Sequence, residues 1–360
     1  MRRNESMLLP SYIGSKFNHV KRVSAVADTS CDTLIEPFCG SAAVTMLTPV
    51  CRYKKYIIND MNTNIAFLYE AMRRESTRDR MVEELLKINK SDDEIAARSQ
   101  FNNAAKQLLP TGKVDLSKIE DDELIKAGVN TYIAYTQSFN SNSTNYTTYK
   151  TQSKYARDSG VRINNSKAKF GELQEKLEVT CDDGLEIIER FKNCRNVQMY
   201  IDPPYVGLYR LCNKLYRQEM PLLINHIKLA MALKDAKCAV ILSGYRAPDP
   251  NVPTIYDAIL NGDNWHCFKL ADTYNKCKNA KFGENKKRCT EYIWTNRVPK
   301  FASLDLSMKD YKENLSFDEY WIKIAELCKT HKIPKKHVKE YKATYHQLYG
   351  KDLYEGKEGE

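Results

Sequence analysis

The sequence lacks any apolar run long enough to cross a bilayer, and its first five residues lead into no apolar signal-peptide core. It has no low-complexity tract. Its 11 cysteines form no Cys-x-x-Cys pair and no cluster with histidine at zinc spacing. We therefore expect no membrane segment, no metal site, and free thiols in a reducing compartment, with the cytoplasm as the default location.

The chain is long, basic and rich in tyrosine. Its 360 residues, 42% of them hydrophobic, can form one large domain with an insertion, or two domains. The formal net charge is +10, and 23 residues are tyrosine. A basic protein suits a polyanionic partner, and aromatic rings among basic side chains can stack on exposed bases. Nucleic acid is therefore favoured over a membrane surface.

The stretch with the most chemical content is Asp202-Pro203-Pro204-Tyr205, which follows the apolar, strand-like residues 197–201. At the carboxyl end of a strand in an open α/β sheet, these groups would lie where ligands bind. The prolines stiffen the turn and hold the Asp202 carboxylate and the Pro203 carbonyl as hydrogen-bond acceptors, while Tyr205 offers a flat stacking face. Two acceptors and a stacking ring suit the binding of an exocyclic aromatic amine whose lone pair must face an electrophile. The structural alternative is a proline turn that only ends a buried strand.

Two upstream segments predict a nucleotide-type binding unit. Residues 33–46 read as a short apolar strand, a turn at Gly40 and the start of a helix of small residues. Because this loop has one glycine where dinucleotide-binding loops have three, NAD is disfavoured. The next strand, 55–58, is followed by Asp60, whose carboxylate is well placed for both hydroxyls of a ribose. An Asx turn that caps a helix from about Thr63 is the alternative, and both can hold.

Between residues 65 and 176 the pattern changes to charged helices, predicted over 65–105 and 121–136. An amide-rich loop dotted with tyrosines follows over 137–150, with basic residues after it. Composition favours a flexible linker as much as a DNA-reading loop. Amide side chains can read adenine edges and basic side chains can hold phosphates, so this region is the candidate for DNA recognition.

The α/β pattern resumes at residue 177. The loop 206–220 after the tetrad is long, basic and aromatic, which suits a flap over an extruded nucleotide. A helix is predicted over 222–235, a buried strand over 238–245 and a closing strand over 286–296. Two charged helices, 317–328 and 335–348, end the chain, and the pattern predicts no role for them beyond a surface for a partner or for flanking DNA.

Taken in order, these motifs resemble the DNA N6-adenine methyltransferase family of the D12 class, the Dam-like and phage-like enzymes with an Asp-Pro-Pro-Tyr motif. The resemblance covers about residues 8–297. It departs from the family's donor loop, Phe-x-Gly-x-Gly, at Ala42. The matching segments are Tyr12-Ile13-Gly14-Ser15-Lys16, Phe38-Cys39-Gly40-Ser41-Ala42, Asn59-Asp60-Met61-Asn62, Asp183 and the tetrad.

The resemblance implies an α/β fold, with a mostly parallel, seven-stranded, Rossmann-like methyltransferase sheet and an inserted, mainly helical target-recognition domain. The catalytic domain, which binds S-adenosylmethionine, would comprise residues 1–64 and 177–297. The insertion would comprise residues 65–176, and residues 298–360 would be a C-terminal helical extension of unknown role.

It also implies the site residues. Asp202, Pro203 and Tyr205 are the expected catalytic residues. Asp183 fits a contact with the adenine of the donor better than Asp182, and a helix N-cap is the alternative for it. The expected cofactor-binding residues are Tyr12, Lys16, Glu36, Pro37, Phe38, Gly40, Ser41, Ala42, Asp60, Asp182, Asp183 and Asp202. The expected DNA-binding residues are Lys16, Asn140, Asn142, Tyr146, Lys150, Arg157, Tyr209 and Arg210.

The implied function is site-specific methylation of double-stranded DNA, in which S-adenosylmethionine donates a methyl group to N6 of a flipped-out adenine. The resemblance points to a bacterial or phage-encoded protein, a monomer or weak dimer, with or without a cognate restriction endonuclease that acts separately. Two alternatives stay open. One is a methyltransferase with another amino target, cytosine N4 or RNA adenine, and the other is a non-catalytic DNA-binding relative.

Overall fold

The computed structural model describes residues 12, 14–88, 93–138, 141–147, 159–210, 217, 219–274, 288–297 and 310–354. Within these residues, seven strands form one sheet in the order β3-β2-β1-β4-β5-β7-β6. The strands are β1 (Thr33–Glu36), β2 (Lys55–Asn59), β3 (Leu177–Thr180), β4 (Val197–Ile201), β5 (Ala239–Tyr245), β6 (His266–Tyr274) and β7 (Arg288–Thr295).

The sheet is mostly parallel. Strands β3, β2, β1, β4 and β5 run in one direction, and Ile35 of β1 pairs with Ile57 of β2 and with Met199 of β4. Strand β7 is antiparallel to both of its neighbours, β5 and β6. The expected seven-stranded, mostly parallel α/β sheet is therefore confirmed.

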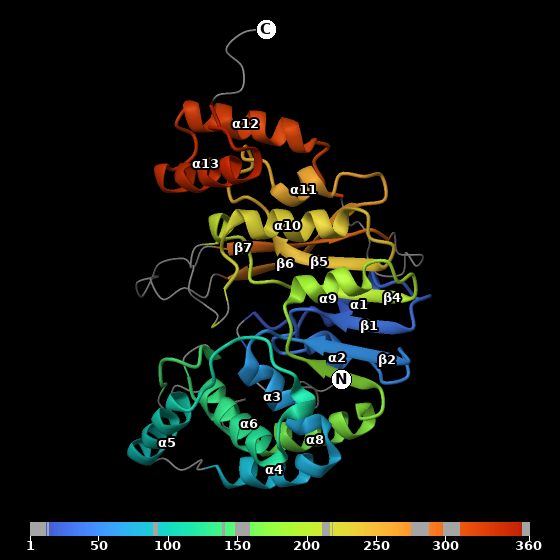
Figure 1. Ribbon diagram of the computed structural model, residues 1–360, viewed down its shortest axis with the longest axis vertical. Helices are drawn as coiled ribbons and strands as arrows, with labels where there is room; N and C mark the ends of the chain where they lie inside the picture. Colours follow the sequence, from blue (N-terminus) through green and yellow to red (C-terminus); the bar gives the residue numbers. More distant parts are fainter. Residues whose placement is uncertain are drawn as a thin grey trace.

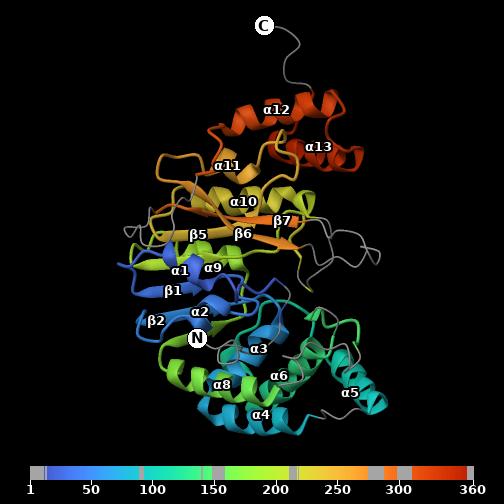
Figure 2. The same cartoon turned by 180° about the vertical axis from the view of Figure 1, so that it is seen from behind.

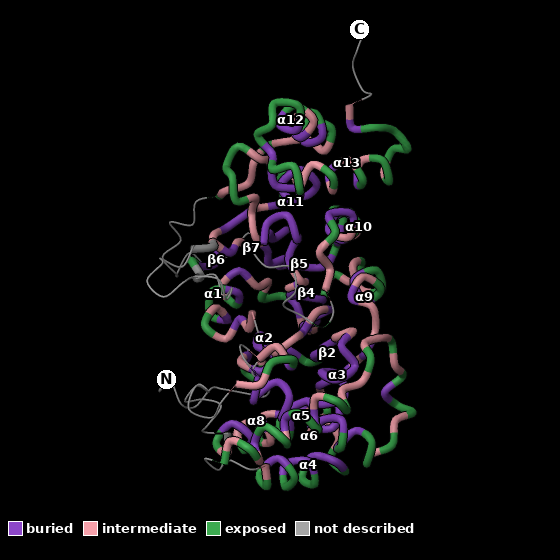
Figure 3. The backbone as a smooth tube through the Cα atoms, turned by 90° about the vertical axis from the view of Figure 1, so that its left-hand side faces the viewer, coloured by how far each residue is buried: buried purple, intermediate pink, exposed green. Residues whose placement is uncertain are grey.

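Both faces of the sheet are covered, because successive side chains of a strand point to opposite faces. Leu34 belongs to one core, which also contains residues of α1 (Val20–Ala25), α2 (Ala43–Leu47) and α3 (Thr63–Arg73). Ile35 belongs to the other core, with residues of α9 (Gly184–Phe191), α10 (Leu223–Lys234) and α11 (Ile255–Ile259). The strands are accordingly buried along much of their length (Figure 3).

The described residues between β2 and β3 are mainly helical. They form α3, α4 (Glu75–Lys87), α5 (Glu94–Lys106), the short 3-10 turn η1 (Leu116–Lys118), α6 (Asp121–Thr136) and α8 (Ser159–Leu173). Helix α6 has the bounds predicted from the sequence. These helices lie together at one end of the molecule (Figure 1). Their buried residues, such as Met81 and Leu124, join the same core as Leu34, so the inserted helices and the sheet share one continuous core.

Two further helices, α12 (Phe317–Lys329) and α13 (Lys335–Tyr349), lie at the opposite end of the molecule from the inserted helices (Figures 1 and 2). They pack against α11 and α10 respectively, and their bounds agree with the predicted helices within one residue. None of the helices in the described part of the chain is both long enough and apolar enough to cross a membrane.

A buried amide fixes the loops that follow three neighbouring strands. Asn59, at the end of β2, is fully buried. Its Nδ2 donates to the carbonyl oxygens of Pro37 (2.8 Å) and Asp182 (3.0 Å), which follow β1 and β3. Its Oδ1 accepts hydrogen bonds from the Asp182 amide (2.8 Å) and the Thr180 hydroxyl (2.8 Å). One side chain thus sets the relative positions of three loops at the carboxyl edge of the sheet.

Candidate active site

A pocket of about 220 Å³ opens at the carboxyl edge of the parallel strands. Its walls come from the segments that follow β1, β2, β3 and β4, together with the N-terminal segment and the start of α10. It spans the junction of β1 and β4, where the order of the strands reverses, the usual ligand position in open α/β sheets. Among the lining residues are Tyr12, Lys16, Glu36, Phe38, Gly40, Ser41, Asp60, Asp183, Asp202 and Pro204.

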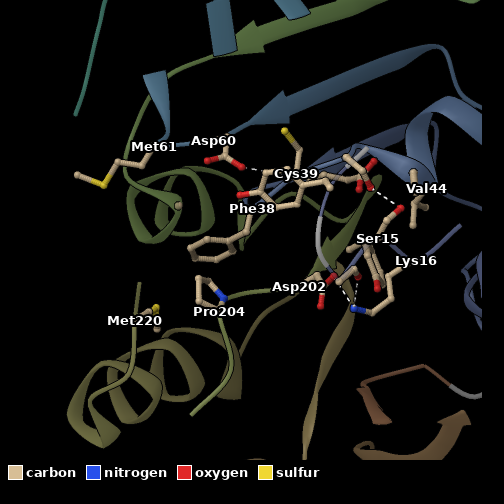
Figure 4. A pocket seen from close by; sticks show the side chains of 18 of the residues that line it. Ser15, Lys16, Phe38, Cys39, Val44, Asp60, Met61, Asp202, Pro204 and Met220 are labelled. Carbon is tan, nitrogen blue, oxygen red and sulfur yellow. Dashed lines mark hydrogen bonds and ion pairs between the residues drawn. The ribbon is translucent and has the colours of Figure 1, made fainter. Parts of the chain in front are cut away.

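An ion pair between the buried Lys16 and the partly exposed Asp202 lies in this pocket (Figure 4). Lys16 Nζ is 2.8 Å from Asp202 Oδ2 and 3.8 Å from Glu291 Oε2, and it also donates to the Gly14 carbonyl at 3.1 Å. Burial alone would lower the pKa of Lys16, but Asp202 and Glu291 outweigh it and raise the pKa well above its usual value. The ammonium therefore stays charged and links the N-terminal segment to the end of β4.

Tyr205 holds the second oxygen of the same carboxylate. Its hydroxyl donates a hydrogen bond to Asp202 Oδ1 at 3.0 Å. Its ring packs edge-on against Tyr245, with 4.6 Å between the ring centroids, and Lys16 Nζ lies 5.2 Å from its centre. The sequence predicted a stacking face at Tyr205, and that role stays a prediction. The hydroxyl contact, which orients Asp202, was not expected from the sequence.

The loop after β1 is held by rings on both sides. Gly40 has a φ of +47°, and a Cβ there would lie 3.0 Å from the Tyr12 ring. That ring stacks on Tyr135 of α6 with 5.5 Å between centroids, so it has little room to move. The Tyr69 hydroxyl of α3 donates to the Gly40 carbonyl at 2.7 Å. The inserted helices therefore support the loop that forms one wall of the pocket.

Ala42, where the sequence departs from the family loop, adopts the left-handed conformation, with a φ of 46°. It is fully buried at the start of α2, and it does not line the pocket. An alanine in this conformation costs about 1 kcal/mol relative to glycine. The departure thus affects the backbone of the loop more than the surface that a ligand would meet.

Two carboxyl groups on the floor of the pocket have raised pKa values. Burial raises the pKa of Glu36 from 4.5 to about 7, although Glu36 Oε1 accepts a 2.6 Å hydrogen bond from the Thr45 amide. Burial also raises the pKa of Asp60 from 3.8 to about 6. Asp60 accepts hydrogen bonds from the amides of Gly40 and Asn62, both at 2.9 Å. The expected Asx turn before α3 is therefore present, and the same carboxylate lines the pocket.

The other expected cofactor residues divide into two groups. Phe38, Ser41 and Asp183 line the pocket. Asp183 also caps α9, since its side chain accepts a hydrogen bond from the Leu185 amide at 2.8 Å. Pro37, Ala42 and Asp182 do not line it. The Asp182 carboxylate lies instead 3.5 Å from Arg190. The preference for Asp183 as the contact with the donor's adenine stays a prediction.

Three of the expected DNA-binding residues, Asn140, Lys150 and Arg157, lie outside the described residues. Two others lie in the described part of the amide-rich loop. The Asn142 side chain accepts hydrogen bonds from the amides of two following residues, both at 3.1 Å, and so shapes a local turn. The Tyr146 hydroxyl donates to Glu94 Oε2 of α5 at 2.8 Å. This contact fastens the loop to the inserted helices.

The two expected DNA-binding residues after the tetrad are buried. Tyr209, in the turn η4 (Gly207–Tyr209), is 4% exposed, and its hydroxyl accepts a hydrogen bond from the Ile255 amide at 3.2 Å. This placement differs from the expected flap, because the ring packs in the core that contains Ile35. Arg210 forms a 2.7 Å ion pair with Glu219, which lines the pocket. Its Nε and Nη1 are buried and have no hydrogen-bond partner among the described residues.

Sequence reasoning missed part of the site. Glu291 lies in the closing strand β7, which we expected to be mostly structural, and its contact with Lys16 depends on the strand order. Met220 and Asn225 line the pocket from the start of α10. The buried His226 accepts a hydrogen bond from the Tyr256 hydroxyl at Nδ1 and donates from Nε2 to the Met220 carbonyl, at 2.6 and 2.7 Å. Burial lowers the pKa of His226 to about 4, so the ring is neutral and fixes this wall.

The charges of the pocket limit the ligands that fit it. Five of the described lining residues are carboxylic acids, and Lys16 is the basic one among them. Such a lining disfavours phosphate groups and suits a ligand with positive charge and several hydroxyl or amino groups. Within the described residues, no group of three or more His, Cys, Asp and Glu side chains is arranged to hold a metal ion. The acidic α/β pocket beside an Asp-Pro-Pro-Tyr turn fits the class of group-transfer enzymes.

Comparison with known families agrees with this class. The family model for D12 class N6 adenine-specific DNA methyltransferases matches residues 12–242, which is more than half of the chain. The chain belongs to this family, and it is therefore a methyltransferase of a family that methylates adenine N6 in DNA. A comparison with curated proteins finds no match.

The glycine of the pocket loop gives a stability prediction. Gly40→Ala should lower the free energy of unfolding by about 1–3 kcal/mol, because the new Cβ meets the Tyr12 ring and the left-handed backbone disfavours a side chain. Urea unfolding measures the change. Gly112→Ala is the matched control, since a Cβ there meets nothing within 4 Å. Equal stabilities of the two variants would contradict the packing described for this loop.

Proposed function

We propose that the protein transfers the methyl group of S-adenosylmethionine to N6 of a flipped-out adenine at specific sites in double-stranded DNA. The observation that carries the proposal is the position of Asp202. This carboxylate lies in the pocket at the end of β4, held by Lys16 on one oxygen and by Tyr205 on the other. Membership of the D12 class family supports the choice of adenine N6 and of DNA.

The residues of the pocket fit the donor. S-adenosylmethionine, when bound, supplies an electrophilic methyl group on a positively charged sulfur. Asp60 is suited to the two ribose hydroxyls and Asp183 to the amino group of the donor's adenine. The buried Glu36 carboxyl, whose pKa is about 7 in the free protein, gains from a cationic ligand, because a nearby positive charge favours its ionised form. Gly40 lets the backbone of the loop approach the ligand.

Asp202 and Pro203 would hold the amine that is methylated. Each carboxylate oxygen has a second lone pair, so Asp202 can accept a hydrogen bond from N6 while it keeps its contacts with Lys16 and Tyr205. The Pro203 carbonyl accepts the second hydrogen bond, which turns the nitrogen lone pair toward the methyl group. The carboxylate stabilises the positive charge that develops on N6 and is a base for the proton that N6 must lose. Much of the acceleration would come from this alignment.

The target adenine must leave the stack to reach this site, which costs a few kcal/mol. We assign its stacking to the Tyr205 ring, and this assignment requires the contacts of the ring with Tyr245 and Lys16 to rearrange. Arg210 carries a buried positive charge, and two of its nitrogens have no hydrogen-bond partner among the described residues. It lies next to a residue of the pocket wall and is suited to a backbone phosphate of the target strand. We do not assign a DNA contact to the buried Tyr209.

The helices between β2 and β3 are the proposed target-recognition domain. They support the pocket loop through Tyr69 and Tyr135, so DNA held by them would lie beside the donor. Asn142 and Tyr146, with Asn140, Lys150 and Arg157 on sequence grounds, are the proposed DNA contacts of this domain. We retain the expectations of a monomer or weak dimer, and of a restriction endonuclease, where one exists, that acts separately.

Methyl transfer tests the proposal. Purified protein is incubated with labelled S-adenosylmethionine and unmethylated genomic DNA, and the products are identified as nucleosides and mapped along the DNA. Label should appear in N6-methyladenine within one short sequence motif. Asp202→Ala should lose at least about 10³-fold in rate, because N6 is left without its acceptor. Label in N4-methylcytosine, RNA or protein would show that the substrate is not adenine in DNA. Binding of the donor without transfer to any acceptor would support a non-catalytic DNA-binding protein.

The raised pKa of Glu36 predicts how donor affinity depends on pH. The ionised form of Glu36 attracts a cationic ligand, and this form increases as the pH rises through about 7. The ratio of the affinities of wild type and Glu36→Gln for S-adenosylmethionine should therefore rise by about tenfold between pH 6 and pH 8. Titration calorimetry measures both affinities, and the ratio removes effects from titration of the donor itself. Asp182→Asn is the control outside the pocket, and a constant ratio would contradict the role of Glu36.

A further inference from the structure

The C-terminal helices α12 and α13 have no part in the function described so far. They lie outside the region that matches the family model, which ends at residue 242. They nevertheless pack against α11 and α10, at the end of the molecule opposite to the inserted helices (Figure 1). Their buried aromatic residues, including Tyr320, Trp321 and Tyr341, share a core with Tyr209 and Ile201.

Helix α13 is fastened to the wall of the pocket. The Leu223 amide, at the start of α10, donates a 2.8 Å hydrogen bond to Glu340 Oε1 of α13. Met220 and Asn225, three residues before and two residues after Leu223, line the pocket. Although it lies at one end of the molecule (Figure 1), helix α13 therefore contacts the segment that forms this wall of the pocket.

The segment that carries this contact is strongly basic. Between residues 329 and 342 the chain has six lysines and a single acidic residue, Glu340, whose side chain is engaged with α10. We call these lysines the basic cluster. Five are exposed and Lys342 is partly exposed, and none forms an ion pair with a carboxylate of the described residues. The basic cluster consists of Lys329, Lys332, Lys335, Lys336, Lys339 and Lys342.

The fold keeps these like charges together. On α13, Lys335, Lys339 and Lys342 are spaced four and three residues apart and so share one face, while Tyr341 and Thr344 are buried. Lys329, from the end of α12, joins that face, because its Nζ and that of Lys342 lie 5.7 Å and 4.1 Å from the centre of the same ring, Tyr354. Like charges held close together repel one another, and an anionic partner relieves that repulsion.

The position and length of α13 fit double-stranded DNA. Its 15 residues span about 22 Å, comparable with six or seven base pairs, and duplex DNA carries a negative charge about every 1.7 Å along its axis. Lys336 lies one helical turn before Glu340 on the same side of α13, so it flanks the contact with α10. A duplex that extends from the pocket toward α13 would meet this face.

We propose that the basic cluster binds the phosphate backbone of the duplex that flanks the target adenine, on the side of the catalytic domain away from the inserted helices. The inference rests on the proposed function, and it adds a second DNA-contacting surface to the inserted domain. The cluster contributes affinity without base specificity, since lysines that contact phosphates position a protein on DNA but read no sequence.

The test is the salt dependence of DNA binding by the full-length protein. The variant Lys335→Gln, Lys336→Gln, Lys339→Gln is compared with wild type on a 30-base-pair duplex that contains the methylated motif. The slope of log affinity against log salt concentration should become shallower by about 2–3, since each lost phosphate contact removes about 0.9. At low salt the DNA affinity should fall at least about tenfold. The affinity for S-adenosylmethionine, the rate at saturating DNA and the thermal unfolding temperature should stay those of wild type.

A control variant removes the same number of charges elsewhere. Arg195→Gln, Lys234→Gln, Lys237→Gln alters exposed residues just before β4 and β5, at the edge of the sheet opposite to the pocket. It should bind DNA within about twofold of wild type, with the same salt slope.

The outcomes separate the inference from the function on which it rests. Suppose that the wild-type protein methylates DNA, but the cluster variant has the same DNA affinity and the same salt slope as wild type. This result overturns the inference and leaves the proposed function unaffected. Absence of transfer to DNA by wild type overturns both. If the cluster variant binds DNA as wild type does but no longer binds anionic phosphatidylglycerol vesicles, the inference is overturned in favour of a membrane surface as the partner of the cluster.

Discussion

The ion pair between the buried Lys16 and the partly exposed Asp202 is the contact on which the active site depends. It joins the N-terminal segment to the end of β4, and it leaves the Asp202 carboxylate oriented by Lys16 on one oxygen and Tyr205 on the other. A buried charge whose partner is removed typically costs 3–5 kcal/mol, about half of the stability of an average domain. The proposed chemistry requires a hydrogen-bond acceptor, the Asp202 carboxylate, that faces the pocket in a fixed orientation. The ion pair therefore stabilises the arrangement on which the chemistry depends.

Two other carboxylates of the pocket act in the opposite sense. Glu36 and Asp60 are held where burial raises their pKa values to about 7 and about 6, so their ionised forms cost stability in the free protein. Such residues are typical of binding sites, because a ligand of opposite charge recovers that cost. The inserted helices and the C-terminal helices support two different walls of this pocket, through Tyr69 and Tyr135 on one side and Glu340 on the other. Both ends of the molecule are thus coupled to the site between them.

Much of the fold was predictable because its signals are local. The buried strands before Asp60 and Asp202 and helix α6 follow from apolar periodicity, and the tetrad follows from residue chemistry at a strand end. The sequence predicted one helical stretch over 65–105, whereas the structure divides it into α3, α4 and α5. No glycine or proline marks the first break, after Arg73. The reason is tertiary, because the Arg74 guanidinium bonds the carbonyl oxygens of Leu116 and Ile119. Strand β6 was not predicted, and the contact of Glu291 with Lys16 could not be, because it depends on β7 pairing beside β5.

The most direct test of this account is a double-mutant cycle on the unfolding free energy with Lys16→Met, Asp202→Asn and the combined variant, measured by urea denaturation at pH 8. If the ion pair joins the N-terminal segment to β4, the two single changes should be strongly non-additive, with a coupling energy of about 2–4 kcal/mol. Additivity within about 0.5 kcal/mol would mean that the two side chains act independently, and would contradict the central role of this pair.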